Sequence, residues 1–148
     1  MDIEYLDTAT PAEEGAFLHL EHPAHGHKLY TGEGTSKIGE LVDADLPHEA
    51  VGIYVRGWHS DSVQAVILQY ERDSMEKKPS SFTQHKNVGR KIAKALIVKF
   101  QGITTNGEPL KADEGGIAAL LDKSPRLEAQ IIRFAKDDAN FFTDAPNG

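Results

Sequence analysis

The spacing of apolar residues divides this chain into a first part with the period of strands and a second part with the period of helices. Apolar and polar side chains alternate along 17–22 and again along 51–55, as they do in strands that bury one face. The run His-Pro-Ala-His-Gly at 22–26 predicts a turn leading into another short strand at 27–30. Together these segments predict a small antiparallel sheet of about three strands near the N-terminus.

Beyond residue 57 the apolar positions recur at the three- and four-residue steps of amphipathic helices. A first helix is expected from a cap at Ser60-Asp61-Ser62 to about Lys77, since serine and aspartate oxygens satisfy free N–H groups at a helix start. A second helix is expected from Val88 through Phe100, ended by Gly102.

The last third of the chain carries clear turn and cap signals. Asn106-Gly107 predicts a tight turn with positive φ, because these residue types tolerate the left-handed conformation. Asp113 is the expected cap of a short third helix, and Ser124-Pro125 the expected start of a fourth. In the fourth helix, Leu127, Ile131 and Phe134 form the predicted buried stripe.

These patterns predict an α+β fold, with a small N-terminal antiparallel sheet followed by a helical region of about four helices. We expect an extended N-terminal arm at 1–15, a single domain at 16–142 and a polar tail at 143–148. Within that domain, 16–57 should be rich in strand and 58–142 helical. The segment 31–47, rich in glycine, serine and acids, is expected to be a loop of variable order.

Composition narrows the class of protein. The chain has 148 residues, of which 39% are hydrophobic and 26% charged, values typical of one globular domain. It contains no cysteine, which excludes disulfides, thiolate nucleophiles and sulfur-ligated zinc. The first residues lack the basic and apolar regions of a signal peptide and no apolar run approaches a bilayer span, so we expect a cytosolic, non-membrane protein.

Charge is unevenly distributed along the chain. The net charge is −7, which argues against nucleic acid as a main partner because such binding depends on clustered cations. Acids concentrate in the first half, whereas Lys86, Arg90 and Lys94 form a basic stretch of the second predicted helix. We expect this face to be solvated or to meet an acidic surface on a neighbouring subunit.

Histidines are the only residues that suggest chemistry. His19, His22, His25 and His27 lie close together in the sequence, and imidazole binds zinc or nickel. His19 and His22 should point to opposite faces of a strand, so exposed hairpin histidines are the favoured interpretation over a metal site. His59, beside Ser60 and Asp61, does not make a catalytic triad with them, because a triad needs residues brought together by the fold. We expect it to lie at a helix N-terminus instead. We therefore expect a non-enzymatic protein without cofactors.

Five short motifs occur in order along the chain, at 2–8, 22–26, 57–61, 102–110 and 125–142. They include the His-Pro-x-x-Gly turn, the Ser-Asp helix start and the Gly-Glu-Pro-Leu turn. In this order they resemble a group of small proteins from the morphogenesis modules of tailed bacteriophages. The resemblance extends over nearly the full length, and its motifs mark turns and helix ends rather than reactive groups.

The resemblance implies a virion structural or assembly protein, such as a capsid decoration or cement protein or a head or tail connector subunit. Its partners would be capsid, connector or tail subunits, and it would form an oligomer or lattice first in the host cytoplasm and then in the virion. The alternative is a tail assembly chaperone that binds the tape measure protein and is absent from the virion. In either case the expected contact residues are Tyr5, Leu6, Trp58, Phe141, Phe142, Lys86, Arg90 and Lys94.

Overall fold

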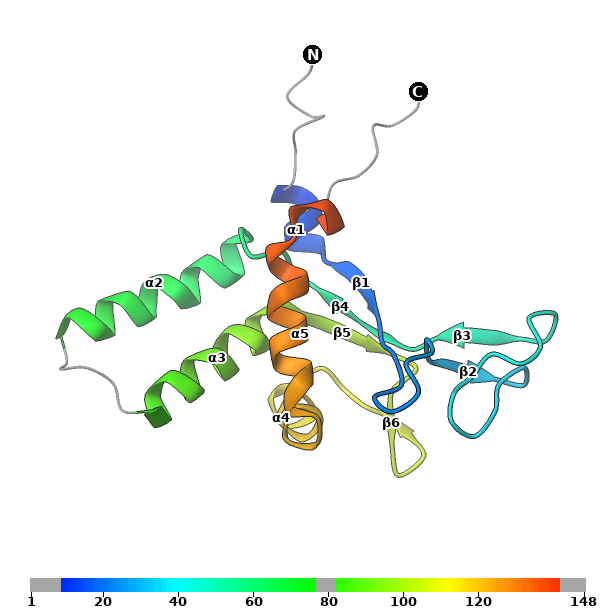
Figure 1. Ribbon diagram of the computed structural model, residues 1–148. Helices are drawn as coiled ribbons and strands as arrows, with labels where there is room; N and C mark the ends of the chain where they lie inside the picture. Colours follow the sequence, from blue (N-terminus) through cyan, green and yellow to red (C-terminus); the bar gives the residue numbers. More distant parts are fainter. Residues whose placement is uncertain (1–8, 77–81, 142–148) are drawn as a thin grey trace, which may run out of the picture.

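The centre of the molecule is a three-stranded antiparallel sheet. The computed structural model describes residues 9–76 and 82–141, and describes side chains over 11–73 and 88–141. The strands β1 (Ala16–His19), β4 (Gly52–Val55) and β5 (Ile97–Gln101) pair in the order β1-β4-β5 (Figure 1). The alternation predicted at 51–55 is confirmed, since Val51, Ile53 and Val55 are all buried.

Most of the helices lie towards one end of the central sheet, and residues 30–50 extend beyond its other end (Figure 1). They are α1 (Ala9–Glu14), α2 (Asp61–Glu76), α3 (Phe82–Leu96), α4 (Glu114–Lys123), α5 (Pro125–Lys136) and a final 3₁₀ turn, η2 (Asp138–Phe141). The core lies where α2, α3, α4 and α5 meet the sheet. It contains Ile53, Val55, Val63, Leu96, Leu121 and Ile131, all essentially inaccessible to solvent. The predicted α+β class, with a three-stranded antiparallel sheet and helices, is confirmed.

The third strand of the sheet was not where the sequence suggested. The second long helix was predicted to continue to Phe100, but α3 ends at Leu96 and β5 begins at Ile97. Because Ile97, Val98 and Phe100 are β-branched or aromatic, they also suit a strand, and β4 offers them a pairing edge. Phe100 lies opposite Ile53 in this antiparallel pair.

The N-terminal segment also differs from the prediction. Residues 9–14 form the helix α1 rather than an extended arm, and the Ala12 side chain is only 3% exposed. Gly57 N–H donates to Ala12 O over 2.7 Å, and a Cβ at Gly57 would lie 2.6 Å from Ala12 Cβ. This close packing makes residues 9–15 part of the folded body.

The predicted cap of α2 is formed differently. Ser60 Oγ has no hydrogen-bond partner among the described residues, so its side chain does not cap the helix. Instead, the Glu13 carboxylate of α1 accepts from both the hydroxyl and the N–H of Ser62. An acid near a helix N-terminus stabilises it, and here that acid comes from another helix.

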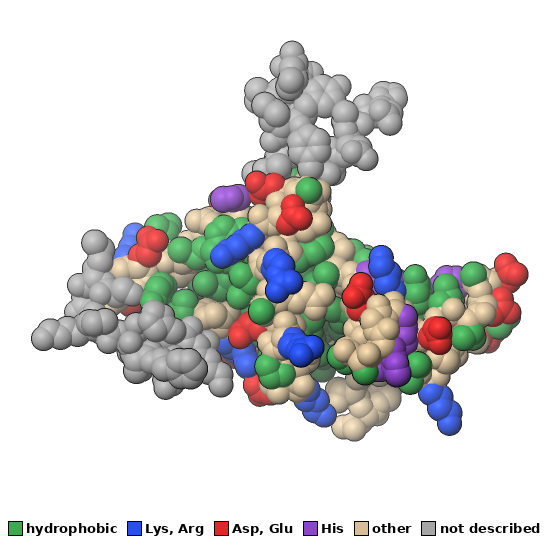
Figure 2. All heavy atoms as spheres, in the orientation of Figure 1, with side chains coloured by type: hydrophobic (Ala, Val, Ile, Leu, Met, Phe, Trp, Pro, Cys, Tyr) green, Lys and Arg blue, Asp and Glu red, His purple; other side chains and the backbone are tan. Residues whose placement is uncertain are grey.

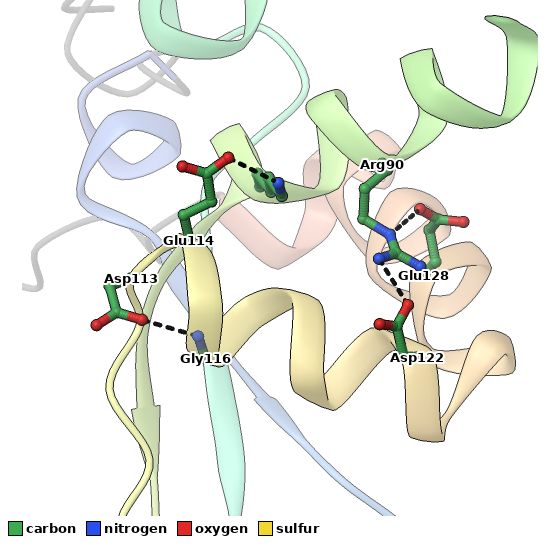
Figure 3. Close-up of polar contacts among 7 residues, drawn as sticks. Arg90, Asp113, Glu114, Gly116, Asp122 and Glu128 are labelled. Atoms are coloured by element: carbon green, nitrogen blue, oxygen red, sulfur yellow. Dashed lines mark hydrogen bonds and ion pairs between the residues drawn. The ribbon is translucent and has the colours of Figure 1, made fainter.

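The turn and cap signals of the last third are largely confirmed. Asn106 and Gly107 have φ of 51° and 82° and join β6 (Thr104–Thr105) to β7 (Glu108–Pro109). Asp113 caps α4 by accepting from Gly116 N–H over 2.7 Å (Figure 3). Ser124 precedes the first-turn proline of α5 as predicted, but its side chain makes no capping hydrogen bond.

The remaining strands form a separate two-stranded ladder. The turn at His22–His27 is present, closed by His22 N–H donating to His27 O over 2.8 Å. However, β1 pairs with β4, and the next strand is β2 (Tyr30–Gly32), which pairs with β3 (His48–Ala50). The segment predicted as a loop at 31–47 thus begins within a strand and contains a further bridge between Thr35 and Leu41.

Candidate protein-interaction site

Among the described residues, most of the exposed large hydrophobic side chains lie on the β2–β3 projection, which we define as residues 30–50. It extends from the end of the central sheet, away from the helices (Figure 1). At its base, Leu20 N–H donates to Val51 O, Leu29 N–H to Leu20 O and Val51 N–H to Leu29 O, all over 2.9 to 3.0 Å. Since Leu20 and Val51 are buried, the projection is anchored directly in the core.

Glycines and backbone hydrogen bonds give the β2–β3 projection its shape. Gly32 has φ of 119°, and a Cβ there would lie 2.4 Å from Pro47 O. A Cβ at Gly34 would lie 2.2 Å from Asp43 O, because the chain crosses itself where Val42 N–H donates to Gly34 O over 2.8 Å. These contacts fix a compact crossing that only glycine allows.

Three aliphatic side chains are exposed on this crossing. Ile38 is 42% exposed, Val42 64% and Leu46 41%; a fourth large exposed hydrophobic residue among those described, Leu68, lies elsewhere, on α2. Single exposed aliphatics are ordinary, but three of the four large hydrophobic residues that are exposed in the described part of the chain lie on this one projection, which makes it the strongest candidate interaction site. In Figure 2 the same end of the molecule shows hydrophobic and acidic side chains side by side.

The β2–β3 projection is also strongly acidic. Lys37 is its one cation by sequence, against the five acids Glu33, Glu40, Asp43, Asp45 and Glu49, which gives a formal balance of −4. These acids are exposed, and none of them forms an ion pair with a described residue. The apolar patch is therefore framed by unneutralised negative charge, which favours partners with basic surfaces.

The basic residues predicted as contacts on α3 are engaged within the chain. Arg90 Nη1 lies 3.0 Å from Asp122 Oδ1 and Arg90 Nε lies 3.3 Å from Glu128 Oε1, and Lys94 Nζ lies 3.3 Å from Glu114 Oε1 (Figure 3). The two carboxylates raise the pKa of Arg90 above its usual value, Asp122 most strongly. The side chain of Lys86 lies outside the described residues. Arg90 and Lys94 thus join α3 to α4 and α5.

Trp58, one of the expected contact residues, is only partly available to a partner. It packs against the core while remaining partly exposed. Its backbone N–H donates to Ala135 O over 2.9 Å. Lys136 Nζ lies 4.5 Å from the centre of its ring, a cation–π distance. The exposed part of the indole therefore stands beside a cation at the end of α5.

The terminal contact residues are only partly described. Phe141 is 3% exposed and packs edge-on against Phe134, with ring centres 5.8 Å apart. Phe141 was expected to contact a partner, but it packs onto the body and offers little surface to one. Tyr5, Leu6 and Phe142 lie outside the described residues.

Three of the four clustered histidines converge at the 22–27 turn. The ring centres of His22 and His25 are 4.6 Å apart, and His27 lies 5.2 Å from His22. His22 Nδ1 accepts from the N–H groups of Ala24 and His25, each over 3.1 Å, which occupies that nitrogen. Within the described ranges, no group of three or more histidine, aspartate or glutamate residues is arranged to hold a metal ion.

The pKa of His22 is lowered below its usual 6.5, mainly by desolvation of its ring and further by the nearby His25 and His27. His19 is separate from this group, because its Nε2 lies 2.7 Å from Leu29 O and its ring packs edge-on against Tyr30. His27 Nε2 lies 3.0 Å from Ile38 O, so the turn contacts the β2–β3 projection directly. The 22–27 turn is therefore joined to the projection through His27.

A shallow groove of about 510 Å³ lies between the histidine turn and the base of the projection. Its walls include Leu29, Tyr30, Ile38 and Val51, and its titratable side chains are His22, Tyr30 and Lys37. It presents no paired carboxylates and no nucleophile held by a base, which are the arrangements that general acid–base or covalent catalysis requires. The groove instead adds apolar surface next to the exposed aliphatics.

Sequence reasoning missed the β2–β3 projection as a site. Residues 31–47 read as a polar loop, and the contact residues were placed at the termini, Trp58 and α3. The available signal was the presence of Ile38, Val42 and Leu46 in a stretch otherwise rich in glycine, serine and acids. Large aliphatics in such a stretch have no predicted element to bury them.

Comparisons with family models, with curated proteins and with solved structures found no significant match. In the described part of the chain, every helix is too short or too polar to cross a membrane.

Proposed function

We propose that this chain is a non-enzymatic structural or assembly protein of a tailed bacteriophage particle, which acts through protein–protein contacts. The observation that supports the contact mechanism best is the β2–β3 projection, an anchored, rigidly folded extension with exposed aliphatics framed by acids. The particle itself is suggested by the motif order that resembles small phage morphogenesis proteins. In this proposal its partners are capsid, connector or tail subunits.

The physical role of such a projection is to bind a preformed surface. Its backbone is fixed by hydrogen bonds before contact, so little conformational entropy is lost on binding. Ile38, Val42 and Leu46 supply apolar area to the centre of the contact, and the surrounding carboxylates select basic partners and exclude acidic ones. These properties suit a subunit held at fixed sites in a symmetric particle.

Quantitative mass spectrometry of purified phage particles tests this proposal. A structural subunit is expected in the particle at a fixed copy number relative to the major capsid protein. A tail assembly chaperone would be abundant in infected cells and absent from the particle. Absence from both particles and assembly intermediates would contradict the proposal.

A matched pair of variants then tests the proposed contact surface. Val42→Asp places a charge in the exposed patch and should reduce the copy number in particles. Leu68→Asp places the same charge on an exposed aliphatic of α2 and should leave the copy number unchanged. Equal incorporation of the two variants would exclude the β2–β3 projection as the contact.

A further inference from the structure

The outward face of α5 carries a stripe of three exposed cations. Arg126, Ala129, Arg133 and Lys136 follow at steps of three, four and three, which places them on one face of a helix, and all four are exposed. The opposite face, with Leu127, Ile131 and Ala135, is buried in the core. Figure 2 shows Lys and Arg side chains gathered over this helix.

The three cations of this stripe have no acidic partner among the described residues. The one acid of the helix, Glu128, turns inward to Arg90, and the carboxylate of Asp137 accepts from Ala139 N–H over 3.1 Å in the turn that follows α5. At the C-terminal end of the stripe, Lys136 stands over the half-buried ring of Trp58. We call this surface, Arg126, Arg133, Lys136 and Trp58, the α5 stripe.

The α5 stripe and the β2–β3 projection are complementary in charge and chemistry. One carries exposed cations beside an aromatic ring, and the other carries a balance of −4 around three exposed aliphatics. The two surfaces lie in different parts of the molecule (Figure 1), with the sheet between them, so they do not meet within one chain.

We propose that the β2–β3 projection of one copy of this chain binds the α5 stripe of a second copy. This deepens the proposed function, and it rests on that function only in taking the projection as a protein-binding surface. Each copy then has one donor surface and one acceptor surface. Such head-to-tail contacts generate a ring if the rotation closes and an open chain if it does not.

Ionic strength gives the first test of this contact. Opposed surface charges interact over about 10 Å in 0.1 M salt and over a shorter range in more concentrated salt. In sedimentation velocity experiments on the full chain, oligomers should form at low ionic strength and dissociate as salt is added. A chain that remains monomeric at low ionic strength and high protein concentration would overturn the proposal.

Charge reversal at each surface gives the second test. The projection variant carries Glu33→Lys and Glu40→Lys, and the stripe variant carries Arg126→Glu and Arg133→Glu. Each should weaken self-association about a hundredfold, since opposing like charges costs several kcal/mol. The control variant carries Lys91→Glu and Lys111→Glu, two exposed lysines outside the stripe and without an ion pair to any described residue, and should associate like the original chain.

Mixing the two variants distinguishes a head-to-tail contact from any other. The projection variant keeps an intact stripe and the stripe variant keeps an intact projection, so the original contact can form between the two variants although each alone has lost it. The mixture should therefore associate at concentrations at which each variant alone stays monomeric. If the mixture stays monomeric, or if the control variant loses association as well, the proposed pairing is wrong.

Failure of this inference can be separated from failure of the proposed function. If the original chain does not self-associate but is present in particles, and Val42→Asp is excluded from them, the projection binds a different particle protein and only the self-contact is wrong. Far-ultraviolet circular dichroism and a thermal melt of each variant would establish that the reversed charges leave the fold intact.

Discussion

The helical body and the β2–β3 projection are built by different physical means. In the body, large side chains such as Ile53, Val55 and Ile131 are completely buried, and burial of apolar surface supplies most of its stability. Between residues 30 and 50, Gly34 is the single buried residue, and the shape comes from backbone hydrogen bonds and glycines. Side chains of the projection are therefore free to serve a partner, whereas those of the body are committed to the fold.

The largest difference between the two regions is expected in the loss of stability when one aliphatic side chain of each is truncated. Ile53→Ala removes three buried carbon atoms from the sheet and should lower the free energy of unfolding by about 2–5 kcal/mol. Val42→Ala, on the exposed patch, should change it by less than about 0.5 kcal/mol. Urea denaturation of both variants measures the difference, and similar losses would show that the patch is part of the core.

The next largest difference in stability is expected when one glycine of each region is replaced by alanine. Gly34→Ala introduces a Cβ 2.2 Å from Asp43 O and should open the crossing of the projection at a cost of about 1–3 kcal/mol. Hydrogen exchange should then accelerate at the amides near Val42 and not in β4. Acceleration throughout the chain would mean that the projection and the body unfold as one unit.

Gly89 serves as the matched position for that substitution. It lies within α3, and a Cβ there would meet no atom within 4 Å. Gly89→Ala should raise the free energy of unfolding by about 0.5–1 kcal/mol, because alanine favours the helix interior. Destabilisation by this variant in the same denaturation experiment would contradict the open surroundings of the glycine.

Two serines at the start of α2 should respond oppositely. Ser62→Ala removes the hydrogen bond to Glu13 and should cost about 1 kcal/mol. Ser60→Ala removes a hydroxyl that is 1% exposed and has no partner among the described residues, so it should be neutral or slightly stabilising. Thermal melts of the two variants measure this, and a greater loss for Ser60→Ala would disprove the assignment of the capping contact.

The contact between Glu13 and Ser62 also makes the stability of the chain depend on pH. The Ser62 hydroxyl holds the pKa of Glu13 below its usual 4.5, so the contact contributes fully above that value and weakens as pH falls below it. In Ser62→Ala the acid-induced loss of stability below pH 4.5 should be smaller than in the original chain.

The smallest expected effect is the pH response of the histidine turn. The pKa of His22 is lowered from 6.5 in the folded chain, so the folded state favours its neutral form. Stability at the turn should be complete above pH 6.5 and decrease as pH falls below it, because the unfolded chain then binds more protons. Hydrogen exchange at the base of the projection, measured from pH 7.5 to 5, should show this loss.

His22→Asn separates titration from structure. An asparagine oxygen can accept the two N–H groups that His22 Nδ1 accepts, without titrating. The variant should keep the turn and lose most of its pH response. His59→Asn, at an exposed position outside the turn, should retain the full response, and equal behaviour of the two variants would refute the role of His22.

Local signals predicted the parts of the fold that local chemistry determines. Asn106-Gly107, the cap at Asp113 and the alternation at 51–55 all specify structure through their own backbone or immediate neighbours. By contrast, Val88 to Phe100 carries an unbroken helical spacing across the junction at Leu96. That junction depends on the free edge of β4, which no local pattern contains.

The candidate site could be predicted less well for a similar reason. The capping of α2 by Glu13 and the pairing of Arg90 with Asp122 and Glu128 join segments distant in sequence. The Arg90 pairs engage part of the expected contact surface of α3 with α4 and α5. Exposure of Ile38, Val42 and Leu46 is a property of the whole fold, so sequence spacing alone could suggest but not establish it.

Hydrogen exchange of the full chain at low ionic strength, compared between dilute and concentrated samples, tests most directly whether contact resides in the projection and stability in the body. We expect slower exchange in the concentrated sample at 33–49 and near the α5 stripe, with β4 unchanged. Equal exchange at 33–49 in both samples, or protection confined to other surfaces, would contradict the assignment.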